Sequence, residues 1–173
     1  MTCRAIKAKT MTERMQVPDP ATDLSPQAAS PAQEVMPAPD VMPAPEVMKA
    51  TLQAYVDRIN AGDAAGVLAL FAPGATIEDP IGGPIKSGDD LLAWFTDTVA
   101  FGSRITPVAP LRASHANEAL VVFDVEFTPP GSQRLRIRSA DACTFDTQGR
   151  ITSLRAFWGP DDLEPAEASA ESA

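Results

Sequence analysis

The stretch 134–145 constrains the fold most, because its side chains alternate in character with the two-residue period of a β-strand. One set of alternate positions carries Arg134, Arg136 and Arg138. The other set is mainly apolar and consists of Leu135, Ile137, Ser139, Asp141, Cys143 and Phe145. A strand with one wet face and one dry face is typical of an antiparallel sheet that is covered on one side only. The stretch therefore predicts such a sheet.

Helical patterns precede this strand, and further strand patterns surround it. Apolar residues spaced as on one helix face predict three helices. The first ends at Gly62, the second runs from Asp63 through Phe71, and the third begins at about Asp89. Alternating residues predict strands at 75–79, 104–114, 119–128, 133–146 and 150–159, with a hairpin turn at 146–149. This order predicts an α+β fold, in which three N-terminal helices pack in a curved, mostly antiparallel sheet around a cone-shaped pocket.

The chain divides into one expected domain and two expected tails. Residues 47–163 are long enough for a single domain with a hydrophobic core. Residues 1–46 contain eight of the seventeen prolines and no aromatic residue, so we expect them to be disordered, as we do 164–173. The N-terminal residues lack the apolar run of a signal peptide, and no stretch has the length of a membrane span. We therefore expect no membrane partner. The two cysteines, Cys3 and Cys143, form no disulfide framework, which fits a reducing, cytoplasmic setting.

Composition argues against several classes of function. The formal net charge of −9 disfavours nucleic acid as a partner, because binding phosphates needs clustered lysines and arginines. The three arginines of 134–145 fit a solvated strand face better than a phosphate site. Cys3 and Cys143 make no disulfide framework, and the single His115 lacks partners for a metal site. With no glycine-rich phosphate loop either, the sequence predicts no cofactor and no metal.

Asp141 is the most informative residue, because it lies in the dry face of its predicted strand. An isolated carboxylate there would cost several kcal/mol, so a raised pKa and a neutral acid are expected. A neutral carboxylic acid can donate a hydrogen bond. The alternative is a buried aspartate satisfied by backbone amides, or by an arginine after a bulge.

Asp79 ends the predicted strand 75–79, where alternation places it on the same inward side as Ala75 and Ile77. Pro80 cannot donate to a sheet ladder, so the strand stops and leaves Asp79 at the mouth of the interior. The alternative is an aspartate that only shapes the turn before Pro80.

Tyr55 lies on the apolar face of the first predicted helix, in register with Leu52, Val56 and Ile59. Its hydroxyl should therefore enter the core side of the domain. A buried polar group needs a reason, and the alternative is that the hydroxyl satisfies one partner within the protein, as most buried tyrosines do.

Several motifs together resemble the bacterial Δ5-3-ketosteroid isomerases, which belong to the SnoaL-like, nuclear transport factor 2-like group of folds. They are Tyr55 in AYVDRINAGD, Asp79 in IEDPIGGPIKSG, RASH at 112–115, Asp141 in RSADACTFDTQGRI and Trp158 in RAFWGPDD. The resemblance covers nearly all of 47–163. It implies that Asp79 is the general base, and that Tyr55 and a protonated Asp141 donate to the substrate oxygen, a family trait. It also implies a pocket lined by Trp158, Phe95, Phe71 and Val125.

The same resemblance implies a steroid Delta-isomerase that acts on an apolar 3-ketosteroid without a cofactor, as a homodimer formed through the sheet. The sequence departs from some family members at Phe71 and Thr96, where supporting tyrosines stand, and Tyr55 is its only tyrosine. Two alternatives remain open, because this fold hosts many functions. One is an enzyme of the polyketide cyclase type that acts on another apolar ketone, and the other is a dimeric protein that binds steroids or similar ligands without catalysis.

Overall fold

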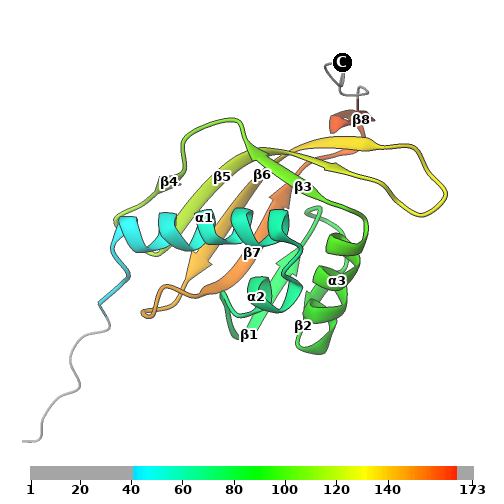
Figure 1. The fold of residues 1–173 in the computed structure, drawn as a ribbon. Coiled ribbons are helices and arrows are strands. Elements are labelled where there is room, and N and C mark those ends of the chain that lie inside the picture. The colour runs from blue at the N-terminus through cyan, green and yellow to red at the C-terminus, as the bar shows by residue number, and fades with distance from the viewer. Residues whose placement is uncertain (1–40, 167–173) are drawn as a thin grey trace, which may run out of the picture. The chain divides into compact units, whose positions relative to one another are not determined.

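The computed structural model of the protein describes residues 41–166 (Figure 1), so the disorder expected for 1–40 and 167–173 lies outside the described residues. The helices are α1 (Pro45–Ala61), α2 (Ala64–Leu68), α3 (Asp89–Ala100) and the 3₁₀ turn η1 (Pro160–Asp162). The strands are β1 (Phe71–Glu78), β2 (Ile85–Ser87), β3 (Arg104–Pro107), β4 (Arg112–Ala113), β5 (Glu118–Phe127), β6 (Leu135–Phe145), β7 (Ile151–Phe157) and β8 (Leu163–Pro165). None of the helices within 41–166 is both long and apolar enough to cross a membrane.

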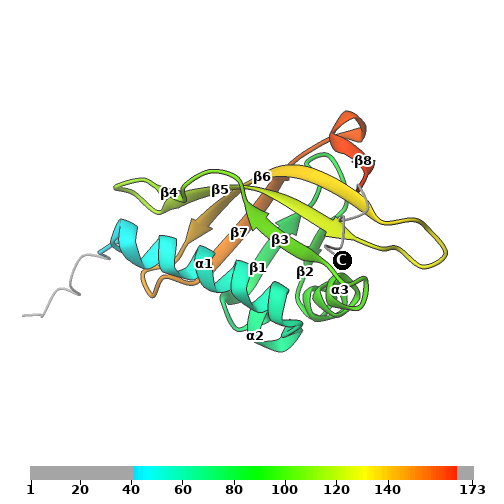
Figure 2. The ribbon, with the colours of Figure 1, turned by 45° about the horizontal axis from the view of Figure 1, so that its top comes forward.

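The strands form one curved mixed sheet in the order β2-β1-β7-β6-β5-β3, with β4 added to β5 and β8 added to β6. Every pair is antiparallel except β1 with β7. Figures 1 and 2 show the three α-helices gathered on one side of this sheet, with α1 crossing it. The predicted α+β fold class is confirmed, including its mostly antiparallel sheet.

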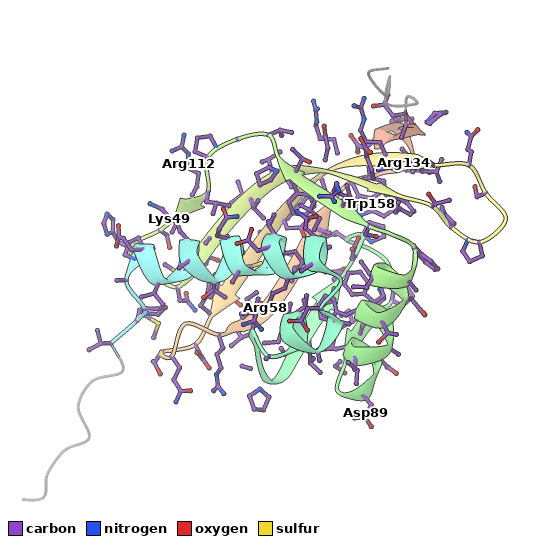
Figure 3. All side chains as sticks on the ribbon, in the orientation of Figure 1. Lys49, Arg58, Asp89, Arg112, Arg134 and Trp158 are labelled. Atoms are coloured by element: carbon purple, nitrogen blue, oxygen red, sulfur yellow. The ribbon has the colours of Figure 1, made fainter. Side chains whose placement is uncertain are left out.

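The alternation of 134–145 is present in β6 as predicted. Its inward residues Ile137, Ser139, Asp141, Cys143 and Phe145 are buried. The outward arginines form ion pairs: Arg134 with Glu126, Arg136 with Glu164, and Arg138 with Asp124. Exposed pairs of this kind contribute at most about 1 kcal/mol each. The arginines therefore make a solvent-facing row on the side of the sheet away from the helices, where Figure 3 labels Arg134.

The prediction that the second helix runs through Phe71 is wrong. Helix α2 ends at Leu68, and Phe71 opens β1 instead of continuing the helix. The reason is long-range pairing, because Phe71 pairs with Ile151 of β7 and the Ile151 amide donates to the carbonyl of Leu70. Gly74, with a positive φ of 77°, lies inside β1 where its register against β7 shifts. Gly74 thus serves an irregularity within a strand.

Other boundaries also differ from the prediction. The single strand expected at 104–114 is two short strands, β3 and β4, which pair separately with β5. Strand β2, which pairs with β1, was not predicted. At the ends of the expected domain, α1 begins at Pro45, before 47, and β8 pairs with β6 as far as Pro165, beyond 163. Pairing with distant strands fixes these short elements, and local sequence carries little sign of it.

Candidate active site

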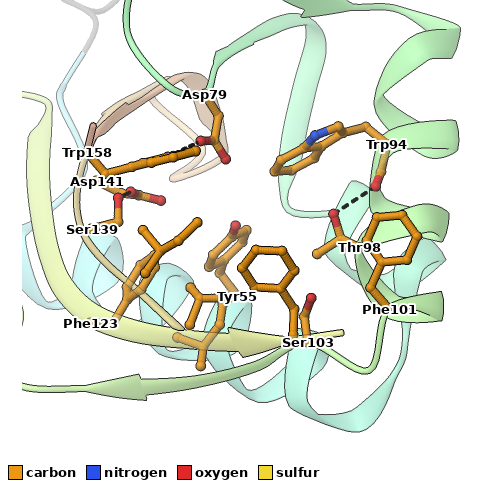
Figure 4. Close-up of a pocket in the computed structure, with 14 residues that line it drawn as sticks. Tyr55, Asp79, Trp94, Thr98, Phe101, Ser103, Phe123, Ser139, Asp141 and Trp158 are labelled. Atoms are coloured by element: carbon orange, nitrogen blue, oxygen red, sulfur yellow. Dashed lines mark hydrogen bonds between the residues drawn. The ribbon is translucent and has the colours of Figure 1, made fainter. Parts of the chain in front are cut away.

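A cavity of about 270 Å³ opens between the helices and the inner face of the sheet. Its lining consists of Tyr55, Asp79, Trp94, Thr98, Phe101, Ser103, Ile105, Phe123, Val125, Phe127, Ile137, Ser139, Asp141 and Trp158. Most of these side chains are apolar, and a few polar groups converge among them (Figure 4). An apolar pocket with a few convergent polar groups is the usual form of a small-molecule site.

Tyr55 reaches this cavity from α1 and is almost fully buried, with 4% of its surface exposed. Its hydroxyl points into the space shared with Asp79 and Asp141 (Figure 4). Burial raises the pKa of this hydroxyl well above its ordinary value, and the nearby charges of Asp141 and Asp79 raise it further. The hydroxyl therefore keeps its proton at neutral pH and is available as a donor.

Phe71 and Phe95 do not line the cavity, which corrects the expectation that they would. Both are buried in the core, and their rings pack edge-on against the ring of Tyr55, with centroid distances of 6.5 and 6.3 Å. They lie behind the tyrosine because the helix face that carries Tyr55 packs against β1 and α3. Their role is to fix the ring of Tyr55, whereas Val125 and Trp158 do line the cavity.

Asp141 lies on β6, opposite Val121 of β5, and only 3% of its surface is exposed. Burial raises the pKa of its carboxyl group to about 8, against a lowering by the hydrogen bond from Ser139 and with a further rise from the charge of Asp79. The β5–β6 ladder is continuous, so no bulge turns an arginine toward this acid. At neutral pH the carboxyl group is mainly protonated and can act as a hydrogen-bond donor.

Asp79 follows the last residue of β1 and turns its carboxyl group into the same cavity (Figure 4). Its Oδ1 atom accepts a hydrogen bond of 2.6 Å from the indole Nε1 of Trp158. Burial raises the pKa of Asp79, whereas this hydrogen bond and the positive charge of Lys86 lower it. The net rise is smaller than at Asp141, so the pocket holds two carboxyl groups of unlike acidity.

Lys86 and Ser139 are polar contributors that the sequence analysis did not assign to the site. The Nζ atom of Lys86 donates to the backbone carbonyl of Asp79 at 3.4 Å and lies 5.3 Å from the ring centroid of Trp94. No sequence signal marked this lysine. Ser139 shares the inward face of β6 with Asp141, so the two-residue period was a signal that could have identified it.

Replacing Trp158 by Phe is expected to raise the pKa of Asp79, because the carboxylate loses the hydrogen bond that favours its charged form. The measurement is a pH titration of the carboxyl carbon-13 resonance of Asp79. Trp94→Phe is the matched control, since Trp94 lines the same cavity without bonding this acid. An unchanged titration of Asp79 in Trp158→Phe would contradict the prediction.

Fold and site together define a small α+β protein whose apolar cavity holds a protonated tyrosine and two unlike acids. The model of the SnoaL-like domain family matches residues 52–154, and the chain belongs to this family, which is nuclear transport factor 2-like in fold.

Individual proteins show the same relationship. The chain is 37% identical to a steroid Delta-isomerase of Nocardioides simplex over 115 residues, which cover 66% of this chain and 92% of that protein. It is 31% identical to the epoxide hydrolase LasB of Streptomyces lasalocidi over 112 residues, 62% of this chain but only 40% of that protein. The solved structure of SalBIII, an epoxide hydrolase/cyclase-like enzyme with a role in pyran ring formation in salinomycin, aligns with a TM-score of 0.65. That alignment has 28% identity and covers 70% of this chain and 97% of SalBIII.

Proposed function

We propose that the protein is a steroid Delta-isomerase, which converts Δ5-3-ketosteroids into Δ4-3-ketosteroids by intramolecular proton transfer. The observation that carries this proposal is the unlike pair of acids: Asp141 with a pKa of about 8 and Asp79 with a smaller rise, in one apolar cavity. An enzyme of this kind needs one acid neutral and the other ionised at the same pH. The similarity to the Nocardioides simplex isomerase supports the same reaction.

In the proposed mechanism Asp79 is the general base. Its carboxylate takes a proton from the carbon between the ketone and the carbon–carbon double bond, and the electrons of the broken C–H bond move toward the ketone oxygen to give a dienolate. The carboxylic acid of Asp79 then returns the proton to the far end of the former double bond. One proton leaves and returns, so the reaction balances without a cofactor. A positioned base contributes about 10²–10⁴-fold to the rate.

Tyr55 and Asp141 have the complementary role in this mechanism. Both are protonated at neutral pH, and both donate to the ketone oxygen as it becomes negatively charged. Each preorganised donor in a water-poor site contributes about 10²–10³-fold. The apolar side chains of Phe123, Val125 and Ile137 keep water away and suit the flat apolar body of a steroid.

The test is to mix the purified protein with a β,γ-unsaturated 3-ketosteroid and to follow the ultraviolet absorbance of the conjugated product. Conversion that is fast in the wild type and absent in Asp79→Asn would establish the reaction and its base. If conversion by the wild type never exceeds that of Asp79→Asn while 2-naphthol still binds, the pocket binds ligands but the isomerase assignment is wrong.

A second candidate function is the acid–base opening of an epoxide, as in an enzyme of the polyketide cyclase type. The same pair of acids favours it, since Asp141 could protonate the epoxide oxygen while Asp79 activates a hydroxyl group or water. Similarity to LasB and SalBIII supports it as well. Turnover of an apolar epoxy alcohol without turnover of the ketosteroid would decide for this candidate. Ligand binding without turnover of either substrate would indicate a binding protein.

We also infer a homodimer formed through the outer face of the sheet, by resemblance to the isomerase family. A shallow groove on that face is lined by small and apolar residues such as Leu120 and Ala142 together with the charged residues Arg112, Glu118 and Arg155. Phe157 stands 50% exposed on β7. Light scattering at several protein concentrations tests this inference, and a monomer at every concentration would refute it.

A further inference from the structure

Ser139 is the one hydrogen-bond partner that the structure gives to the carboxyl group of Asp141 among the described residues. It lies on β6 opposite Phe123, is 4% exposed, and lines the same cavity. Its Oγ atom is 2.7 Å from Oδ1 of Asp141. Residues two apart on a strand point to the same face, so the strand itself holds this contact in place.

The direction of this hydrogen bond decides what the acid can do. A neutral carboxylic acid has one proton to donate, and its other oxygen is an acceptor. If the acid donated to the serine, its proton would be used within the protein. If the serine donates to Oδ1, the proton remains on Oδ2 and can serve a ligand in the cavity.

The surroundings of Tyr55 make this support more important. Phe71 packs against the Tyr55 ring and has no hydroxyl group to offer, and the Thr96 hydroxyl donates instead to the carbonyl of Leu92. Tyr55 is therefore oriented by packing against Phe71 and Phe95. Hydrogen-bond support in this pocket lies on the acid rather than on the tyrosine.

We propose that Ser139 is a positioning residue for Asp141: by donating to Oδ1 it fixes the orientation of the carboxyl group and leaves the proton on Oδ2 to be donated to the ligand oxygen. This inference rests on the proposed function and adds a residue to its machinery. Ser139 acts through Asp141 and takes no proton from the substrate.

The first test measures the acid directly, without turnover. Carboxyl carbon-13 titrations of Asp141, assigned with Asp141→Asn, are compared in the wild type and in Ser139→Ala, Ser139→Thr and Ser103→Ala. A donor favours the charged carboxylate, so Ser139→Ala should raise the pKa of Asp141 and Ser139→Thr should restore it. Ser103 lines the same cavity but is not among the groups that influence the pKa of Asp141, so Ser103→Ala should leave this pKa unchanged. An unchanged pKa in Ser139→Ala overturns the inference.

The second test measures turnover of the β,γ-unsaturated ketosteroid. Ser139→Ala should lower kcat about ten-fold, the value of one ordinary hydrogen bond, with little change in KM. The decline of kcat at alkaline pH should move to higher pH together with the pKa of Asp141, and Ser139→Thr should recover both values. A serine that only fills space would leave the alkaline decline where it is, and that result overturns the inference.

Failure of the proposed function is distinguishable from failure of this inference. If the wild type does not isomerise the ketosteroid, the proposed function falls, and binding of 2-naphthol then replaces turnover as the readout. Ser139→Ala should weaken that binding about ten-fold, since a misoriented acid is a poorer donor to the naphthol oxygen. Ser132→Ala, at an exposed position outside the cavity, should leave it unchanged. Equal binding in the wild type and Ser139→Ala overturns the inference in that case too.

Discussion

Asp79→Asn is expected to lower kcat for a β,γ-unsaturated 3-ketosteroid by about 10²–10⁴-fold, which is the contribution of a positioned general base. The amide has nearly the shape of the carboxyl group but cannot accept the substrate proton. Its oxygen can still accept the indole hydrogen bond of Trp158, so the pocket should keep its form. The measurement is steady-state turnover, together with the affinity for 2-naphthol as a mimic of the enolate.

Binding of 2-naphthol should stay equal or tighten in Asp79→Asn, because a negative charge beside the ligand has been removed. Glu78→Gln is the matched control. Glu78 is the adjacent carboxylate, but it lies on the opposite side of β1 and pairs with Arg155 and the Gly82 amide. This control should retain full turnover. Equal losses of turnover and of naphthol binding in Asp79→Asn would assign Asp79 a structural role instead.

The period of two in 134–145 was sufficient to place Asp141 on the buried face of β6. The prediction succeeds because a long strand with one apolar face has only one register that buries that face. The same period placed Ala75 and Ile77 inside, and both are buried. For Tyr55 the helical period was equally sufficient, since it fixes the side of α1 that meets the sheet. Strong periodicity therefore predicted where the three polar candidates lie.

Local sequence could not predict which aromatic residues face the cavity. Phe95 and Trp94 are neighbours on α3, yet Trp94 lines the cavity while Phe95 is fully buried behind Tyr55. The difference depends on how α3 packs against α1 and β1, which is a property of the assembled domain. The hydrogen bond between Trp158 and Asp79 likewise joins residues 79 positions apart. Contacts of this kind arise from the topology of the sheet, in which β7 lies beside β1.

Asp141 is expected to lower the free energy of unfolding of the protein at neutral pH, because its carboxyl group is buried. Its pKa is about 8 in the folded protein, against about 3.9 in an unfolded chain. The folded state thus binds more protons between about pH 4 and pH 8. The contribution of this group to the free energy of unfolding is fully present below about pH 4 and is lost as the pH rises to about 8. The cause of this loss is burial, which makes the charged carboxylate unfavourable in the folded state.

Asp141→Asn should therefore unfold less readily than the wild type at neutral pH, by up to about 4 kcal/mol at pH 7. Asparagine does not titrate, and its amide oxygen can still accept from Ser139. The measurement is urea unfolding from pH 5 to pH 8. The difference between the two proteins should grow by about 1.4 kcal/mol per pH unit until the wild-type acid ionises. A constant difference across this range would show that Asp141 ionises normally in the folded state.

Turnover should fall in variants of Asp141, although Asp141→Asn should be more stable than the wild type. Asp141→Ala removes the donor and should lower kcat by about 10²–10³-fold. Asp141→Asn retains a weaker donor, so its loss should be smaller, and it should no longer show a decline of kcat near pH 8. Because burial both keeps the acid protonated and makes its ionisation costly, the activity of the wild type and the stability gained by Asp141→Asn have one physical origin. An Asp141→Ala variant with full activity would remove this acid from the mechanism, whatever its effect on stability.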